Sequence, residues 1–176
     1  MQDGQPNWDT MGFNEIWKSD RYRRGFLPAY QFWLRACQCY PHCRFFSNRM
    51  LKLANFIYHS DIPANVRIGK GLYIGHPYCI TINKNSVIGD NCNIHQGVTI
   101  GQENRGVRKG TPVIGNCVWI GINAVIVGNI HVGDDVLIAP NTYVNRDVPS
   151  HSIVFGNPCI IKPTENATAE YINNKV

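Results

Sequence analysis

Asp61 and His76 are the side chains in this sequence best suited to acid–base chemistry on a hydroxyl group. A neutral imidazole near pH 7 can take the proton from a hydroxyl as its oxygen attacks an acyl group. A carboxylate on the other ring nitrogen would fix the tautomer and stabilise the imidazolium. The sequence has no G-x-S-x-G element and no activated cysteine setting, so direct transfer is favoured over an acyl-enzyme. The pair can act if the intervening elements bring the two side chains together.

A six-residue period runs through the middle of the chain, from Ile62 to Val144. Neither an α-helix, with a period of 3.6, nor a strand, with a period of 2, explains it. Two positions per unit point inward and glycines occupy many corners, so each unit is a short strand that must stack on its neighbours. The anchors are Ile62, Ile68, Ile74; Ile82, Ile88, Ile94, Ile100; and Ile114, Ile120, Ile126, Val132, Ile138, Val144. The second inward positions are Leu72, Tyr78, Cys92, Val98, Val118, Ala124, Ile130, Val136 and Thr142.

Two interruptions of the period mark special segments. Between Ile74 and Ile82 the phase slips by two residues. Between Ile100 and Ile114 a longer slip ejects residues 102–111 (QENRGVRKGT), which carry three cations. This segment does not suit a packed strand, so we expect it to protrude from the repeat. Such a loop is either a tolerated surface insertion or a functional arm, and its length favours function.

The repeat resembles that of the hexapeptide-repeat acyltransferases, in particular the serine acetyltransferases and related polysaccharide O-acetyltransferases. The resemblance rests on Ser60–His76 (SDIPANVRIGKGLYIGH), Asn91–Gly101 (NCNIHQGVTIG) and the hexads of Val118–Pro158. It implies a mostly β fold, a left-handed parallel β-helix with three hexads per coil. The general rule for parallel crossovers would favour the right-handed form. The resemblance also implies a homotrimer with active sites between subunits.

The chain is therefore expected to have one domain with appendages at both ends. Prolines break the helical pattern of the N-terminal part into short helices, and the polar composition of the C-terminal tail predicts that it frays. The parts are a short N-terminal helical segment, residues 1–60; the left-handed β-helix acyltransferase domain, residues 61–163, with a protruding loop at 102–111; and a flexible tail, residues 164–176.

In the families that the sequence resembles, an Asp followed fifteen residues later by a His forms the catalytic pair, and Asp61 and His76 stand at that spacing. By hexad counting, Asp61 lies one coil below His76, close enough to orient its imidazole. Three hexads per coil also place the second residue after each anchor in a corner column, beside which we expect the active-site groove. His95 binds the acceptor, assists His76 or caps a corner. The column is His76, Gln96, Ile122 and Pro140.

The resemblance further implies acetyl-CoA as the acyl donor. Backbone groups, small or apolar corner residues and cations near the phosphates would hold it. The matching positions are Gly101, Ile122, Ala139 and Pro140 along the groove, Lys162 after the turn at Gly156–Pro158, and Arg105, Arg108 and Lys109 on the loop. The acceptor-binding candidates are His95, Gln96 and Thr111.

The acceptor is the point at which the sequence departs from the serine acetyltransferases. Gly75 stands where those enzymes have an Asp before the catalytic His, and Gly110 and Thr111 stand where they have an Arg-His pair. An amino acid needs partners for both of its charges. Their loss favours a neutral sugar hydroxyl, on a surface polysaccharide or its precursor. Serine O-acetylation for cysteine synthesis is the alternative.

A non-catalytic β-helix scaffold is a further alternative, from a different class of protein. The Asp61–His76 pair and the basic loop argue against a scaffold, since a purely structural repeat needs neither. A zinc-dependent carbonic anhydrase of this fold needs an H-x4-H pattern, which the sequence lacks. The cluster Cys37, Cys39, His42 and Cys43 has no standard zinc-finger spacing, so no metal is predicted.

The charge and hydropathy of the chain limit its expected partners and cellular location. Seventeen Lys and Arg against twelve Asp and Glu give a net charge of +5. This modest excess suits an anionic small ligand, and nucleic acid is not expected as a partner. No apolar run reaches the length of a membrane span and no signal peptide is visible, so we expect a cytoplasmic enzyme.

Overall fold

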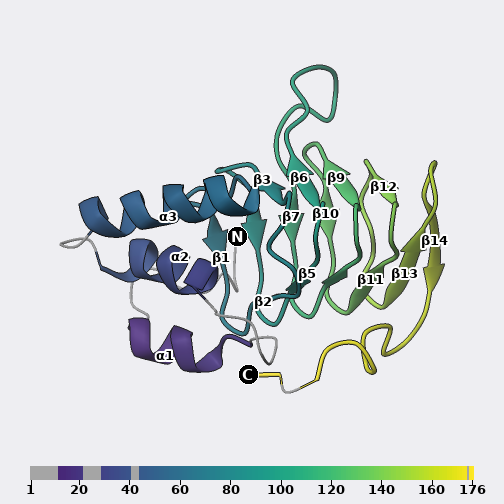
Figure 1. Cartoon of the computed structure of the whole chain (residues 1–176). Helices are drawn as coiled ribbons and strands as arrows, with labels where there is room; N and C mark the ends of the chain where they lie inside the picture. The colour runs from purple at the N-terminus through teal and green to yellow at the C-terminus, as the bar shows by residue number, and fades with distance from the viewer. Residues whose placement is uncertain (1–11, 22–28, 41–43, 174) are drawn as a thin grey trace, which may run out of the picture.

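The computed structural model describes residues 12–21, 29–40, 44–173 and 175–176. The N-terminal part forms three helices, as the sequence predicts. In the sequence, Pro28 stands between the first and second helices and Pro41 between the second and third. They are α1 (Phe13–Ser19), α2 (Ala29–Cys39) and α3 (Arg44–Tyr58). Figure 1 shows all three gathered at the end of the molecule where the first strands lie.

The rest of the chain is a coil of very short parallel strands wound into a triangular prism (Figure 1). The strands are β1 (Arg67–Ile68), β2 (Tyr73–Ile74), β3 (Thr81–Ile82), β4 (Val87–Ile88), β5 (Asn93–Ile94), β6 (Thr99–Gly101), β7 (Val113–Ile114), β8 (Trp119–Ile120), β9 (Val125–Val127), β10 (His131–Val132), β11 (Val136–Ile138), β12 (Tyr143–Val144), β13 (Ser152–Phe155) and β14 (Ile160–Pro163). Face 1 is β1-β4-β7-β10, face 2 is β2-β5-β8-β11-β13-β14, and face 3 is β3-β6-β9-β12. From β1 to β12, successive strands fall on successive faces, so three six-residue units make one coil. The last pair, β13 and β14, is antiparallel.

The register of the faces confirms the stacking predicted from the period. On face 2, Ile74 pairs with Ile94, Ile94 with Ile120, and Ile120 with Ile138. The anchors from Ile62 to Val144 are all buried, most of them fully. One inward prediction was wrong, since Tyr78 is 42% exposed and Ile80 is fully buried instead. The two extra residues between β2 and β3 widen this corner and push Tyr78 outward.

The helices close the open end of the β-helix through a buried arginine. Arg35 on α2 is fully buried and makes a bidentate ion pair with Asp20. It also donates hydrogen bonds to the carbonyl oxygens of Ile68 and Gly69, at 2.8 and 2.5 Å. Those carbonyls belong to the first coil, which has no coil beneath it to supply donors. Burial raises the pKa of Asp20 more than the neighbouring Arg35 lowers it.

The C-terminal tail differs from the sequence prediction of a frayed segment. Figure 1 shows it running back along the β-helix from β14 toward the helical end. Ala167, Thr168 and Ile172 are buried. Asn91 bonds the backbone of Val176 through both amide atoms, each at 2.9 Å. A polar tail can therefore be fixed when side chains of the body satisfy its backbone, which composition alone does not reveal.

The length and hydropathy of the helices show whether one of them could span a membrane. Among the described helices, none is long and apolar enough to cross a bilayer.

Candidate active site

His76 lies in the widened corner between faces 2 and 3, after β2 and before β3, and its side chain is partly exposed. Ser60 fixes this corner from below. Its hydroxyl donates to the carbonyl of Pro77 at 2.6 Å and accepts from the N–H of Ile80 at 3.0 Å. The N–H of Cys79 donates to the carbonyl of Tyr58 at 3.0 Å. The backbone that carries His76 is therefore braced by the segment that leads out of α3.

Asp61 lies on face 3, directly beneath Thr81, with which it forms a parallel bridge. Its N–H donates to the carbonyl of Ile80 at 2.7 Å, and its carbonyl accepts from the N–H of Ile82 at 2.9 Å. The residue is exposed, next to the corner that holds His76. The fourteen residues between Asp61 and His76 thus carry the chain almost once around the prism and return it to the same corner.

His95 is the second imidazole at this site, one coil above Gly75. Its Nδ1 lies 2.9 Å from the carbonyl oxygen of Ile120, and its ring packs between Tyr73 and Trp119, with centroid distances of 6.2 and 4.7 Å. Burial lowers the pKa of His95, the Ile120 carbonyl opposes this, and the nearby His76 lowers it further. Burial of the ring thus favours the neutral form of the His95 imidazole.

The predicted corner column above His76 is present. The carbonyl of Gln96 accepts from the N–H of Asn123 at 3.0 Å, and that of Ile122 accepts from the N–H of Asn141 at 2.9 Å. Gln96, Ile122 and Ala139 are partly exposed and Pro140 is exposed, so the column forms an accessible ridge. Small and apolar side chains on such a ridge can accept the extended, amide-containing arm of a thioester.

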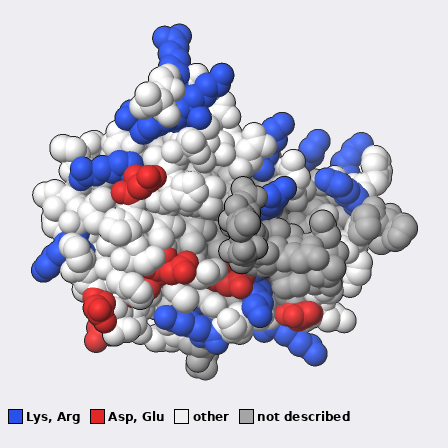
Figure 2. All heavy atoms as spheres, turned by 180° about the vertical axis from the view of Figure 1, so that it is seen from behind, with Lys and Arg blue, Asp and Glu red and all other residues white. Residues whose placement is uncertain are grey.

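The other predicted ligand contacts lie elsewhere in the chain. Gly101 ends β6, at the far side of face 3, and the loop 102–111 leaves the prism there. Figure 1 shows this loop as the largest projection of the β-helix, and Figure 2 shows Lys and Arg side chains crowded on it. Arg108 pairs with Glu103 at 3.0 Å, while Arg105 and Lys109 are exposed.

The structure therefore does not bring Thr111 or the loop cations to the His76 corner within one chain. Face 3 stands between them, and the Thr111 hydroxyl instead donates to the carbonyl of Asn85 at 3.1 Å. Lys162 lies on β14, opposite Ile153, at the last rung of face 2. Counting hexads places residues along the helix axis, and within one chain it leaves the two edges of face 3 apart.

Two side chains at the site were missed by the sequence reasoning. Trp119 packs on His95, and Tyr171 from the tail packs on Trp119 with a centroid distance of 4.9 Å. The position of Trp119 follows from the register, since it pairs with Asn93 on face 2. Nothing in the local sequence of the tail indicates that Tyr171 lies there.

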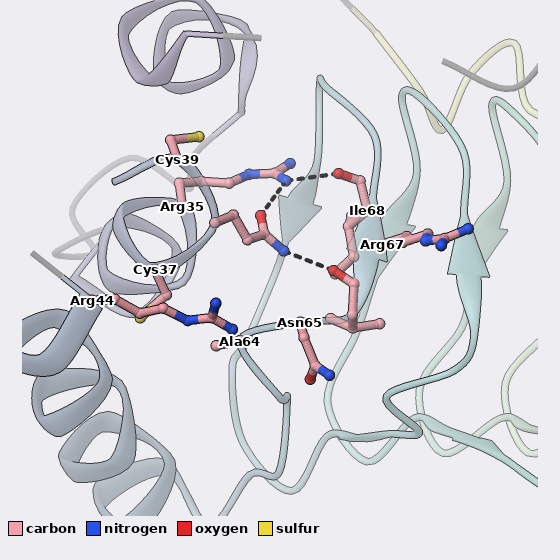
Figure 3. Close-up of a pocket in the computed structure, with 10 residues that line it drawn as sticks. Arg35, Cys37, Cys39, Arg44, Ala64, Asn65, Arg67 and Ile68 are labelled. Carbon is pink, nitrogen blue, oxygen red and sulfur yellow. Dashed lines mark hydrogen bonds between the residues drawn. The ribbon is translucent and has the colours of Figure 1, made fainter. Parts of the chain in front are cut away.

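A separate cavity lies between α2 and the first coil (Figure 3). Its wall includes Arg35, Gln38 and Arg44, and Gln38 bonds the carbonyl of Val66 at 2.9 Å. It holds none of the predicted catalytic residues. In the part of the chain that the structure describes, no group of three or more His, Cys, Asp or Glu side chains could hold a metal. His42 and Cys43 lie outside that part.

The prism and its corner define a class, the hexapeptide-repeat β-helix, and comparison with known proteins agrees. The family model described as bacterial transferase hexapeptide (six repeats) matches residues 111–146. Serine acetyltransferase of Helicobacter pylori is 37% identical over 113 residues, 64% of this chain and 66% of that protein. Serine acetyltransferase of Synechococcus elongatus is 38% identical over 98 residues, 56% of this chain and 40% of that protein.

Solved structures give the same result. Serine acetyltransferase of Neisseria gonorrhoeae, in complex with serine, matches with a TM-score of 0.63 and 30% identity over 76% of this chain and 54% of that one. The enzyme of Brucella abortus matches with a TM-score of 0.66 and 29% identity over 80% of this chain and 56% of that one. The chain thus has the left-handed β-helix fold of the hexapeptide-repeat acyltransferases and is similar in sequence to serine acetyltransferases. It spans between two fifths and two thirds of the length of these relatives.

Proposed function

We propose that this protein is an acetyl-CoA-dependent O-acetyltransferase that uses His76 as general base. The observation that carries the proposal is the convergence of Asp61 and His76 on one braced corner, beside an accessible ridge. Acetyl-CoA supplies the activated acetyl group. His76 removes the proton from the acceptor hydroxyl as its oxygen forms the new ester bond, and the proton then passes to the departing thiolate. Asp61 orients the imidazole and stabilises its charged form.

The acceptor supported by the comparisons is L-serine, because the relatives that match in sequence and in structure are serine acetyltransferases. They support this acceptor more than the sugar favoured in the sequence analysis. A sugar hydroxyl is kept as the second candidate for one specific reason. Gly75, Gly110 and Thr111 lack the charges that an amino acid would need at the matching positions.

For the acyl donor, the corner ridge of Ile122, Ala139 and Pro140 would hold the pantetheine arm. Gly101, at the far edge of face 3, would contact the donor bound to a neighbouring subunit. The cations Arg105, Lys109 and Lys162 would hold the phosphates, which favour exposed guanidinium and ammonium groups. Because face 3 separates the loop from the ridge, the loop cations would act on the site of a neighbouring subunit. We expect no metal to take part.

The proposal includes a homotrimer, which the exposed face of α3 supports. Phe45 and Phe56 on its outer face are 77% and 76% exposed, and Leu53 is 49% exposed. Large apolar side chains grouped on one helix face are typical of interaction surfaces. A second subunit against α3 would bury them.

The test is thiol release from acetyl-CoA by the purified protein, with L-serine and with a panel of sugars and nucleotide-sugars. We expect release that depends on one acceptor class and that falls about 10²- to 10⁴-fold in His76→Ala. His131→Ala, at an exposed position on face 1, is the matched control and should retain activity. Release with a sugar and not with serine would select the second candidate. No acceptor-dependent release, or full activity in His76→Ala, would overturn the proposal in favour of a scaffold.

A further inference from the structure

His95 and Gly75 form one structural unit beside His76. A Cβ atom added at Gly75 would lie 3.0 Å from Cδ2 and 3.3 Å from Nε2 of His95, and 3.3 Å from the ring of Tyr73. A side chain at position 75 and the present ring of His95 would therefore compete for one space. The imidazole occupies the room that an acidic side chain at position 75 would need.

The hydrogen bond at Nδ1 fixes the tautomer of this imidazole. The Ile120 carbonyl can only accept, so Nδ1 carries the proton. In the neutral ring, Nε2 then retains its lone pair and can accept a hydrogen bond. This atom and the neighbouring Cδ2 lie over Gly75, next to the corner of His76.

Two aromatic side chains hold the ring in this orientation. Trp119 packs on one side, and Tyr73 lies edge-on to the ring. Trp119 is in turn covered by Tyr171 from the tail, whose carbonyl accepts from the Asn93 amide at 3.1 Å. A ring clamped in this way keeps Nε2 in place before a ligand binds, which reduces the entropic cost of binding.

We propose that His95 determines acceptor specificity, by accepting through Nε2 a hydrogen bond from a second polar group of the acceptor. This inference rests on the proposed function. The group that it selects is a hydrogen-bond donor, either the ammonium of serine or a further hydroxyl of a sugar. A carboxylate at this point would face a lone pair and be rejected.

The kinetic test compares His95→Leu and His95→Gln, with His131→Leu as the matched control, on the acceptor that supports thiol release. We expect His95→Leu to raise the KM for the acceptor about tenfold, with the KM for acetyl-CoA changed less than twofold. His95→Gln, whose amide oxygen can accept, should recover most of the loss. Equal effects on both substrates, or no recovery in His95→Gln, would show a structural role and overturn the inference.

The serine ammonium and a sugar hydroxyl are separated by substrate analogues. If serine is the acceptor, 3-hydroxypropionate lacks the ammonium and should react equally with the parent protein and His95→Leu. If a sugar is the acceptor, one of its deoxy analogues should behave in this way. Persistence of the His95→Leu defect with every analogue would contradict the hydrogen bond.

A measurement without turnover keeps this inference separate from the proposed function. In protein labelled with ¹⁵N-histidine, we expect the Nδ1–H tautomer of His95 and a shift of its Nε2 resonance when L-serine or a panel sugar is added. A shift without acetyl transfer would retain the binding role and reject the enzyme. An unchanged Nε2 resonance with all of the probes, or the Nε2–H tautomer, would overturn the inference.

Discussion

The positions of the candidate catalytic side chains depend on the backbone contacts that hold them. His76 sits in a corner widened by two residues, and Ser60 bonds both ends of that corner. Asp61 follows Ser60 directly, so one short segment both braces the proposed base and carries the proposed carboxylate partner. This coupling brings two residues that stand fifteen positions apart to one corner, which supports their proposed role as a pair.

At this scale we predict that Asp61→Asn lowers kcat by about tenfold or more while the KM for acetyl-CoA stays within twofold. An amide cannot stabilise the imidazolium that forms as His76 takes the proton. The measurement is steady-state kinetics with both substrates varied, together with a thermal melt to show that the fold is retained. Asp147→Asn, an exposed acid on face 1, is the control. A kcat equal to that of the parent protein would remove Asp61 from the site.

Individual elements of this fold are too short to be stable alone, since most strands have two residues. Their stability comes from stacking on neighbouring coils. The first coil, which has no coil beneath it, and the outer surface of face 2 therefore need contacts from other parts of the chain. At the first coil, Arg35 supplies the donors that a lower coil would have supplied. Along face 2, the tail covers Trp119 and is anchored by Asp135, which accepts from Ala167 and Thr168.

The tail anchor leads to a prediction on pH dependence. Burial alone would raise the pKa of Asp135, but hydrogen bonds from Thr168, His151 and the backbone of the tail outweigh it and lower the pKa. A lowered pKa means that the unfolded state binds the proton more readily. The stability from this group is therefore complete above the ordinary pKa of about 4 and is lost as pH falls through the folded value.

Thr168→Ala removes one of these hydrogen bonds, so the pKa of Asp135 should rise toward its ordinary value. We expect titration of the Asp135 carboxyl carbon by NMR to show this rise. Faster hydrogen exchange of the segment 164–173 at neutral pH should accompany it. Thr164→Ala, whose hydroxyl bonds only a nearby carbonyl on the surface, is the control. An unchanged pKa and unchanged exchange would mean that the tail is held by other contacts.

The whole molecule presents an apolar helix face and a basic loop on a rigid prism. Figure 1 shows α3 and the loop 102–111 both on the upper side of the molecule, at different positions along it. A single chain leaves the loop cations and the corner ridge apart. An assembly with threefold symmetry can bring the loop of one subunit to the ridge of the next.

We therefore predict a solution mass three times the 19.9 kDa of the chain, measured by light scattering after size exclusion. Phe56→Ser combined with Leu53→Ser should weaken the assembly and lower activity, since the site would lose its loop. Ile160→Ser, also at an exposed apolar position but on β14, is the control. A monomer that retains full activity would contradict both the trimer and the shared site.

The repeat by itself determined the prism, the stacking of its faces and the column above His76, because a strict six-residue period leaves one way to bury its apolar positions. Because three hexads make one coil, the spacing of Asp61 and His76 places both residues at the same corner. The tertiary structure decided what no period encodes. It placed the tail on face 2, set Tyr171 on Trp119, seated His95 over Gly75 and moved Thr111 to another face. These contacts join segments far apart in sequence through individual hydrogen bonds and ring contacts, and such pairings leave no periodic trace in the chain.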